Sequence, residues 1–136
     1  MELIYSKVNE GLLLHAVNRL DSIDKPRKDL VSDDQFIQCS ALNLPKNTTF
    51  KPHQHVWKDG PTKCIAQESW VVIKGLVECK FYDLDGEHLT NVLLGPGDAS
   101  FTFQGGHNYV SLEDDTIVYE YKTGPYLGQA LDKVFL

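Results

Sequence analysis

The stretch from Lys51 to Gly75, KPHQHVWKDGPTKCIAQESWVVIKG, carries the strongest indication of the fold and of its chemistry. It begins with His53-Gln54-His55 directly after a proline, and it ends in an apolar run that starts at Glu68. Residues two apart in an extended strand point to the same face, so the two imidazoles can enter one space. Imidazole binds zinc, iron, copper and nickel, and the Glu68 carboxylate could add an oxygen donor. The stretch therefore predicts a metal site.

The remaining histidines differ in their surroundings. His107 follows the glycine-rich sequence GPGDASFTFQGG and is the candidate for a fourth ligand. His15 lies in the N-terminal segment and His88 follows an Asp-Gly turn, so we expect both at the surface. An isolated His-x-His pair is more often a surface feature than a metal site. Here Pro52 favours an extended backbone before the pair, which supports the metal interpretation.

Length and charge limit the classes of function. A chain of 136 residues suits one domain with one core. The formal net charge of -6, with no basic stripe, argues against nucleic acid or a membrane surface as partner. We find no signal-peptide pattern and no apolar run near the roughly 20 residues of a membrane span, so a cytoplasmic protein is expected. Three cysteines, without a CxxC pair, predict free thiols.

From Gln35 onward the pattern is that of β-strands. Short alternating or apolar runs recur at regular spacing and are separated by turn sequences such as Asp85-Gly86 and Gly95-Pro96-Gly97-Asp98. This spacing predicts an all-β sandwich or barrel over residues 35–136, with residues 1–34 as an N-terminal extension that packs on it. Within that extension, residues 11–20 fit a helix or a strand equally well.

Together these motifs resemble the cupin superfamily, whose members are double-stranded β-helices, that is, jelly-roll barrels. The family's first motif is matched by His53, His55, Glu68 and Gly75, and its second by Pro96-Gly97-Asp98 leading to Gly105-Gly106-His107. Twelve residues separate His55 from Glu68, so a longer loop than is usual in the family must leave and re-enter the barrel mouth. The resemblance covers roughly residues 36–121.

The resemblance implies that His53, His55, Glu68 and His107 converge inside the barrel on one divalent metal, whether zinc, iron, manganese or nickel. Several sequences, among them QESWVVIKG and FQGGHNY, are similar to small cupins of the WbuC-like group associated with bacterial surface polysaccharide biosynthesis. That similarity suggests sugar chemistry by analogy, because one fold supports many reactions.

Four further residues are candidates for contact with a small-molecule ligand. Trp70 shares the inward face of Glu68 and would wall the cavity, and Gln67 could reach ligand at the barrel mouth. Glu120 and Tyr121 are adjacent in the last predicted strand, so one of them must point inward, where it could act in catalysis or support a metal ligand.

Three functions remain open at this point. The metal could act as a Lewis acid on a sugar-like substrate in an isomerase or epimerase, or a ferrous ion could activate dioxygen in a dioxygenase. The third is a non-catalytic binding or regulatory domain. We expect a neutral or singly anchored ligand under the loop of residues 56–67, because few basic residues are predicted to face the cavity apart from Lys58 and Lys63 in that loop. The extended residues 1–7 and the apolar Leu12 to Leu14 predict a homodimer.

Overall fold

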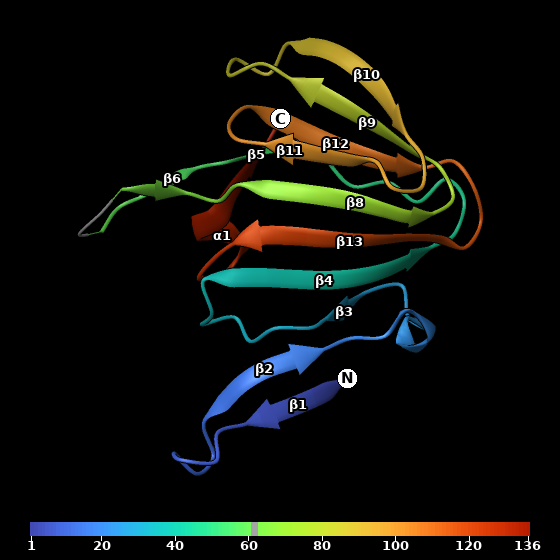
Figure 1. The fold of residues 1–136 in the computed structure, drawn as a ribbon. Helices are drawn as coiled ribbons and strands as arrows, with labels where there is room; N and C mark the ends of the chain where they lie inside the picture. Colours follow the sequence, from blue (N-terminus) through green and yellow to red (C-terminus); the bar gives the residue numbers. More distant parts are fainter. Residues whose placement is uncertain (61–62) are drawn as a thin grey trace.

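Two five-stranded antiparallel sheets form the body of the protein in a computed structural model, which describes residues 1–60 and 63–136. One sheet has the order β10-β9-β12-β5-β14 and the other the order β11-β8-β13-β4-β3 (Figure 1). The buried core joins side chains from both sheets. The strands of the two sheets are β3 (Lys28–Asp29), β4 (Ile37–Leu44), β5 (His53–His55), β8 (Glu68–Lys74), β9 (Val77–Tyr82), β10 (His88–Leu94), β11 (Ala99–Thr102), β12 (Gly106–Ser111), β13 (Thr116–Thr123) and β14 (Lys133–Phe135).

The inner face of the sheet that contains β8, β13 and β4 changes from polar at one end of the strands to apolar at the other. Along β8 the buried side chains alternate with half-buried ones, as the period of two requires. At one end lie Glu68 and its β13 partner Lys122, and at the other lie Val72 and its partner Val118. Trp70 and Glu120 are paired between them. The polar end is therefore where a site can form, and the apolar end is core.

The short strand β5 lies between β12 and β14 in the other sheet. His53 is opposite His107 of β12 and opposite Phe135 of β14, while His55 is opposite Lys133. Directly opposed residues of antiparallel strands share a face, so all of these side chains point to the same side of the sheet. Strand β14 was not predicted from the sequence, and neither was the helix before it, α1 (Gln129–Asp132).

The N-terminal residues contribute in two ways. Residues 20–31 pack on the outer face of the β4–β13 sheet, where Ile23 and Leu30 are buried against Cys39 and Ala41, and β3 pairs with β4. Ahead of them, β1 (Glu2–Tyr5) and β2 (Leu13–Val17) form a hairpin whose residues are almost all exposed. In Figure 1 this hairpin lies beyond β3, at the edge of the molecule. Within the ambiguous segment of residues 11–20, Leu13–Val17 is thus a strand, which pairs with β1.

The loop between His55 and Glu68 contains a second hairpin, of β6 (Trp57–Lys58) and β7 (Cys64–Ile65), which projects from the barrel (Figure 1). We predicted that residues 56–67 cover the site. Two residues of this loop, 61 and 62, lie outside the described residues. The helices in the described part of the chain are the 3-10 turn Leu20–Ser22 and α1, and neither is long and apolar enough to cross a membrane.

Candidate metal centre

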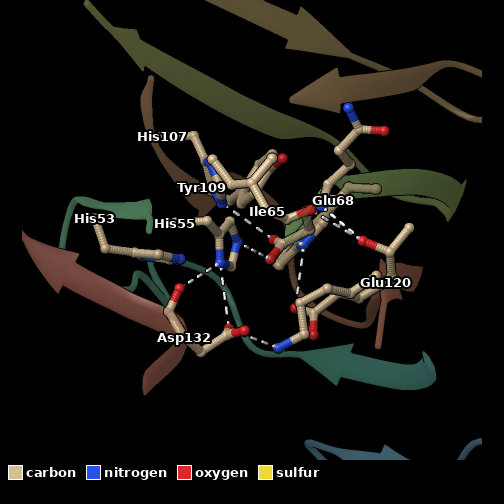
Figure 2. Close-up of polar contacts among 12 residues, drawn as sticks. His53, His55, Ile65, Glu68, His107, Tyr109, Glu120 and Asp132 are labelled. Atoms are coloured by element: carbon tan, nitrogen blue, oxygen red, sulfur yellow. Dashed lines mark hydrogen bonds and ion pairs between the residues drawn. The ribbon is translucent and has the colours of Figure 1, made fainter. Parts of the chain in front are cut away.

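Four buried side chains meet at the polar end of the barrel. His53, His55, Glu68 and His107 each offer one ligand atom, and these atoms all lie within 4.8 Å of one another. His53 and His55 come from β5, Glu68 from the start of β8 in the opposite sheet, and His107 from β12. Figure 2 shows the imidazoles and the carboxylate directed at a common point. The structure thus brings together the four residues that the sequence analysis singled out.

The hydrogen-bonding pattern within this cluster is consistent with a bound metal cation. The Glu68 carboxylate lies 3.2 Å from Nε2 of His55 through one oxygen and 3.2 Å from Nε2 of His107 through the other. The Nε2 atom of His53 is buried and has no hydrogen-bond partner among the described residues. Because a buried polar nitrogen without a partner is costly, this atom points to a ligand that the side chains do not supply. Three imidazoles and one carboxylate are a donor set suited to a divalent transition metal.

The surroundings of His53, His55 and Glu68 shift the pKa values of these three groups differently. Burial lowers the pKa of His53 to about 4, against the hydrogen bond to the Lys51 carbonyl, so this ring is neutral and its lone pair is available. Burial also acts to lower the pKa of His55, but contacts with Asp132 and Glu68 outweigh it and raise this pKa to about 9. Burial opposes ionisation of Glu68, yet His107 and His55 hold its pKa well below the ordinary value. Glu68 is therefore ionised, whereas His55 must lose a proton before it binds a cation.

Asp132, the last residue of α1, supports His55 from the side opposite Glu68. Its carboxylate lies 3.2 Å from Nδ1 of His55, so the imidazole is held between two carboxylates (Figure 2). Asp132 is fully buried and also pairs with Lys58 at 2.6 Å and Lys122 at 3.3 Å. The hydrogen-bond partner of this Nδ1 is the backbone carbonyl oxygen of Asp132, 3.3 Å away, and such an outer hydrogen bond fixes which ring nitrogen faces the metal. Asp132 was not predicted as a site residue, because a lone acidic residue in a four-residue helix gives no recognisable sequence pattern.

A cavity of about 530 Å³ opens beside the cluster, and His53 and Glu68 form part of its wall. Trp70 also lines it, and its indole is stacked on Tyr109 with ring centroids 4.0 Å apart. The indole N–H lies 3.2 Å from Glu68 Oε1 and 3.2 Å from Glu120 Oε2, so it can donate to either carboxylate. Phe50, Tyr126 and Phe135 supply further aromatic surface to the same cavity.

Glu120 and Tyr121 point to opposite sides of their sheet, as adjacent strand residues must. Glu120 lines the cavity and accepts a hydrogen bond of 2.8 Å from Nη2 of Arg27, which also pairs with Asp29. Tyr121 lies on the outer face, in a separate, largely apolar groove. Gln67 is exposed and borders that same groove. The structure therefore brings Trp70 and Glu120 to the cavity, and it does not bring Tyr121 or Gln67 there.

Comparisons with solved structures identify the architecture. KdgF from Halomonas sp. is 23% identical, with a TM-score of 0.53 over 71% of this chain and 77% of that one. The capsular polysaccharide assembling protein CapF from Staphylococcus aureus is 15% identical, with a TM-score of 0.66 over 85% of this chain and 31% of its own. These neighbours are cupins. The chain has the cupin fold.

An oxalate decarboxylase from B. subtilis has a similar fold as well, at 15% identity and a TM-score of 0.61, over 84% of this chain and 29% of that chain. No family model and no curated protein sequence matches the chain. The cupin fold predicted from the strand spacing and the two motifs is thus confirmed. The chain carries a buried cluster of His53, His55, Glu68 and His107 that suits a metal ion.

Proposed function

We propose that this cupin is a metal-dependent isomerase or epimerase that binds a small sugar-like molecule and moves a proton on it, in surface polysaccharide biosynthesis. The observation that carries the proposal is that one cavity is lined by two of the four metal-ligand residues, His53 and Glu68, by aromatic side chains, and by a carboxylate outside the ligand set, Glu120. Small-molecule pockets combine apolar walls with a few placed polar groups in this way. The similarity in fold to a capsular polysaccharide assembling protein supports the biological setting.

The aromatic side chains around the cavity support a ring-shaped polar ligand. Trp70, Tyr109 and Phe50 give a rigid apolar surface, and the first two are fixed by their stack. The apolar face of a sugar ring can lie against such a surface, while its hydroxyls meet hydrogen-bonding groups at the polar end. Ser40 and Gln38 of β4, both buried, are such groups in the cavity wall.

His53, His55, Glu68 and His107 would hold the metal. A divalent ion bound there would supply Lewis acidity to a carbonyl or hydroxyl oxygen of the ligand and, if it is ferrous iron, the capacity to activate dioxygen. The ligand set is buried, so water is largely excluded from it, and electrostatic interactions are strong in such a site.

Glu120 is the group that we assign to proton transfer. Arg27 and the Trp70 indole each hold one of its oxygens, which fixes the carboxylate at the cavity wall. The Glu120 carboxylate would take a proton from the carbon beside a carbonyl, and the electron pair left behind would move onto the carbonyl oxygen. For isomerisation, the hydroxyl proton of that carbon would pass to the former carbonyl oxygen, and the abstracted proton would return to the former carbonyl carbon, so that the carbonyl group changes place. Return of the proton to the opposite face of the same carbon would give epimerisation.

A non-heme iron dioxygenase is the second candidate, because the ligand set contains only nitrogen and oxygen donors of the kind that iron accepts. A non-catalytic binding or regulatory cupin is the third. Oxygen consumption with iron-loaded protein separates the dioxygenase from the other two functions. Turnover separates the isomerase from the binding domain.

Incorporation of deuterium from heavy water tests the proposed function directly. Metal-loaded protein is incubated with a panel of sugars, sugar acids, sugar phosphates and nucleotide sugars, and exchange at carbon is followed by NMR. Exchange should occur with the metal-loaded protein and disappear in Glu120→Gln, while Glu113→Gln, at an exposed position, should exchange normally. Absence of exchange with every sugar, or full exchange in Glu120→Gln, would overturn the proposed reaction.

We also propose that the cupin is a homodimer. The β1–β2 hairpin exposes a set of apolar side chains on both of its faces, each 44–52% accessible: Leu3, Ile4, Tyr5, Leu12, Leu13 and Leu14. A two-stranded hairpin with so little burial is only marginally stable alone. A second copy of the chain would cover this surface.

A further inference from the structure

The cavity beside the metal-ligand cluster is lined by four basic side chains and three carboxylates, in a chain of net charge -6. Most of these charges are paired. Arg27 lies between Glu120 at 2.8 Å and Asp29 at 3.0 Å, and Lys122 pairs with Asp132 behind the wall at 3.3 Å. The third carboxylate of the lining, Glu68, belongs to the metal-ligand set. The remaining two basic residues are Lys51 and Lys133.

Lys51 and Lys133 have no carboxylate within ion-pair distance among the described residues. Lys51 immediately precedes the β5 region, its carbonyl lies 2.9 Å from Nδ1 of His53, and its ammonium lies 5.5 Å from the centre of the Phe135 ring. Lys133 is opposite His55 in the β14–β5 pair and therefore shares the inward face of that strand. Both lysines thus border the cavity on the side of His53.

The ammonium group of Lys133 is partly removed from water and has no carboxylate partner among the described residues. The side chain is half-buried, and a partly desolvated ammonium without a counter-charge is unfavourable. The carboxylates that line the cavity already pair with other cations or belong to the metal-ligand set, so none of them neutralises the Lys133 ammonium. A divalent ion on the four ligands would add further positive charge next to these lysines. In an otherwise acidic protein, such a local positive region attracts and orients an anion.

We propose that Lys51 and Lys133 form an oxyanion subsite, so that the ligand of this cupin carries a carboxylate or phosphate at the end nearest His53. The inference rests on the proposed function for the rest of the ligand, which would extend along the aromatic wall toward Trp70 and Glu120. The ligand class is then a sugar acid or a sugar phosphate. Of the neutral or singly anchored ligand that the sequence suggested, this proposal keeps the singly anchored form and moves the anchor to two basic side chains that face the cavity.

Lys58 and Lys63, the two lysines that the sequence suggested for contact with an anion, are not placed for that role in the structure. Lys58 is held by Asp132 at 2.6 Å and takes part in the support of His55. Lys63 is exposed in the loop and does not line the cavity. Neither Lys51 nor Lys133 was a candidate from the sequence. Lys133 was missed because β14 and its pairing with β5 were not predicted.

The experiment compares metal-loaded wild type with Lys51→Met/Lys133→Met by calorimetry. The probes are galacturonate, galactose 6-phosphate and galactose, with malonate and inorganic phosphate as anions that are not sugars. Lys74→Met is the matched control, because Lys74 is exposed and lies outside the cavity. The wild type should bind at least one sugar anion more tightly than galactose. The double variant should lose that affinity by about tenfold or more, since each contact is a charge-assisted hydrogen bond.

Several outcomes separate the subsite from the proposed function. Preference for galacturonate over the sugar phosphate would identify a carboxylate ligand, and the reverse a phosphate; either supports the subsite. If malonate or phosphate binds the wild type but not the double variant while no sugar binds, the subsite stands and the sugar assignment falls. Equal binding of sugar anions by the wild type and the double variant would overturn the subsite and leave the sugar assignment intact. If the wild type and the double variant show the same affinity for every probe, the subsite is overturned as well.

Discussion

Nδ1 of His55 lies 3.2 Å from a carboxylate oxygen of Asp132, a residue 77 positions further along the chain. This contact joins the C-terminal segment to the metal-ligand cluster. It also directs the other nitrogen of the ring, Nε2, toward Glu68 and the common point of the four ligands. The C-terminal segment is therefore part of the site, although it contributes none of the four predicted ligands.

Asp132→Asn tests this support. The substitution keeps the volume of the side chain but removes the charge that pairs with Lys58 and Lys122 and holds His55. We expect metal affinity to fall roughly 10- to 100-fold, as for other outer partners of metal-binding histidines. The free energy of unfolding should fall by about 3 kcal/mol, because two lysines lose a buried partner. Chelator competition and denaturant titration measure these changes.

Asp115→Asn is the control for that change. Asp115 is exposed and its nearest cation, Lys74, is 3.9 Å away, so both quantities should stay near wild type. Wild-type metal affinity in Asp132→Asn would show that Asp132 does not orient His55.

The acid dependence of metal binding follows from the pKa of His55, which its two carboxylate neighbours raise to about 9. Metal binds the deprotonated ring, so protons compete with the metal at any pH below that value. As pH falls from about 8.5 to about 7, His55 alone should lower the apparent affinity about tenfold per pH unit. His53, with a pKa of about 4, contributes nothing in this window. An affinity independent of pH there would contradict the assignment of His55 as a ligand.

Much of the site was predictable because its ligands lie on regular strands. His53 and His55 share a face by the period of two, and the approach of Glu68 and His107 follows the family pattern. The sequence also indicated that only one of Glu120 and Tyr121 could point inward. Which one does so depends on the register between β13 and β8, where Glu120 is opposite Trp70. That register is a tertiary property that the strand's own residues do not specify.

The C-terminal part of the site was not predictable for a different reason. Strand β14 has three residues and follows a helix of four, so neither has enough length for a periodic signal. Its position depends on pairing with β5, across a long separation in sequence. Asp132, Lys133 and Phe135 reach the site only through that pairing.

Gly75, the last residue of the first motif, has a structural role that substitution can measure. Its φ is +84°, and an added Cβ would lie 2.9 Å from the backbone Cα of Thr116. Gly75→Ala should therefore lower the free energy of unfolding by about 3 kcal/mol, from backbone strain and overpacking together. Gly97→Ala is the matched control, since its φ is +91° but its Cβ would meet nothing within 4 Å. It should cost about 1 kcal/mol. Equal losses would show that the contact with Thr116 is unimportant.

The proposed dimer is tested by light scattering at micromolar concentration. The wild type should have about twice the chain mass of 15.4 kDa. Leu12→Glu/Leu14→Glu places charges on the apolar hairpin and should give monomers, whereas Leu84→Glu, at an exposed leucine in the β9–β10 turn, should remain dimeric. A wild type of monomer mass with an intact N-terminus would rule out the dimer.

Metal analysis of protein purified without an affinity tag tests the central claim most directly. The wild type should contain about one divalent transition-metal ion per chain, held by His53, His55, Glu68 and His107. His53→Ala/His55→Ala should remove nearly all of it, because two of the four ligands are lost, whereas His88→Ala, at an exposed histidine, should retain it. Near-full occupancy in the double variant, or no metal in the wild type after incubation with zinc, iron, manganese and nickel, would contradict the assignment of this cluster as a metal centre.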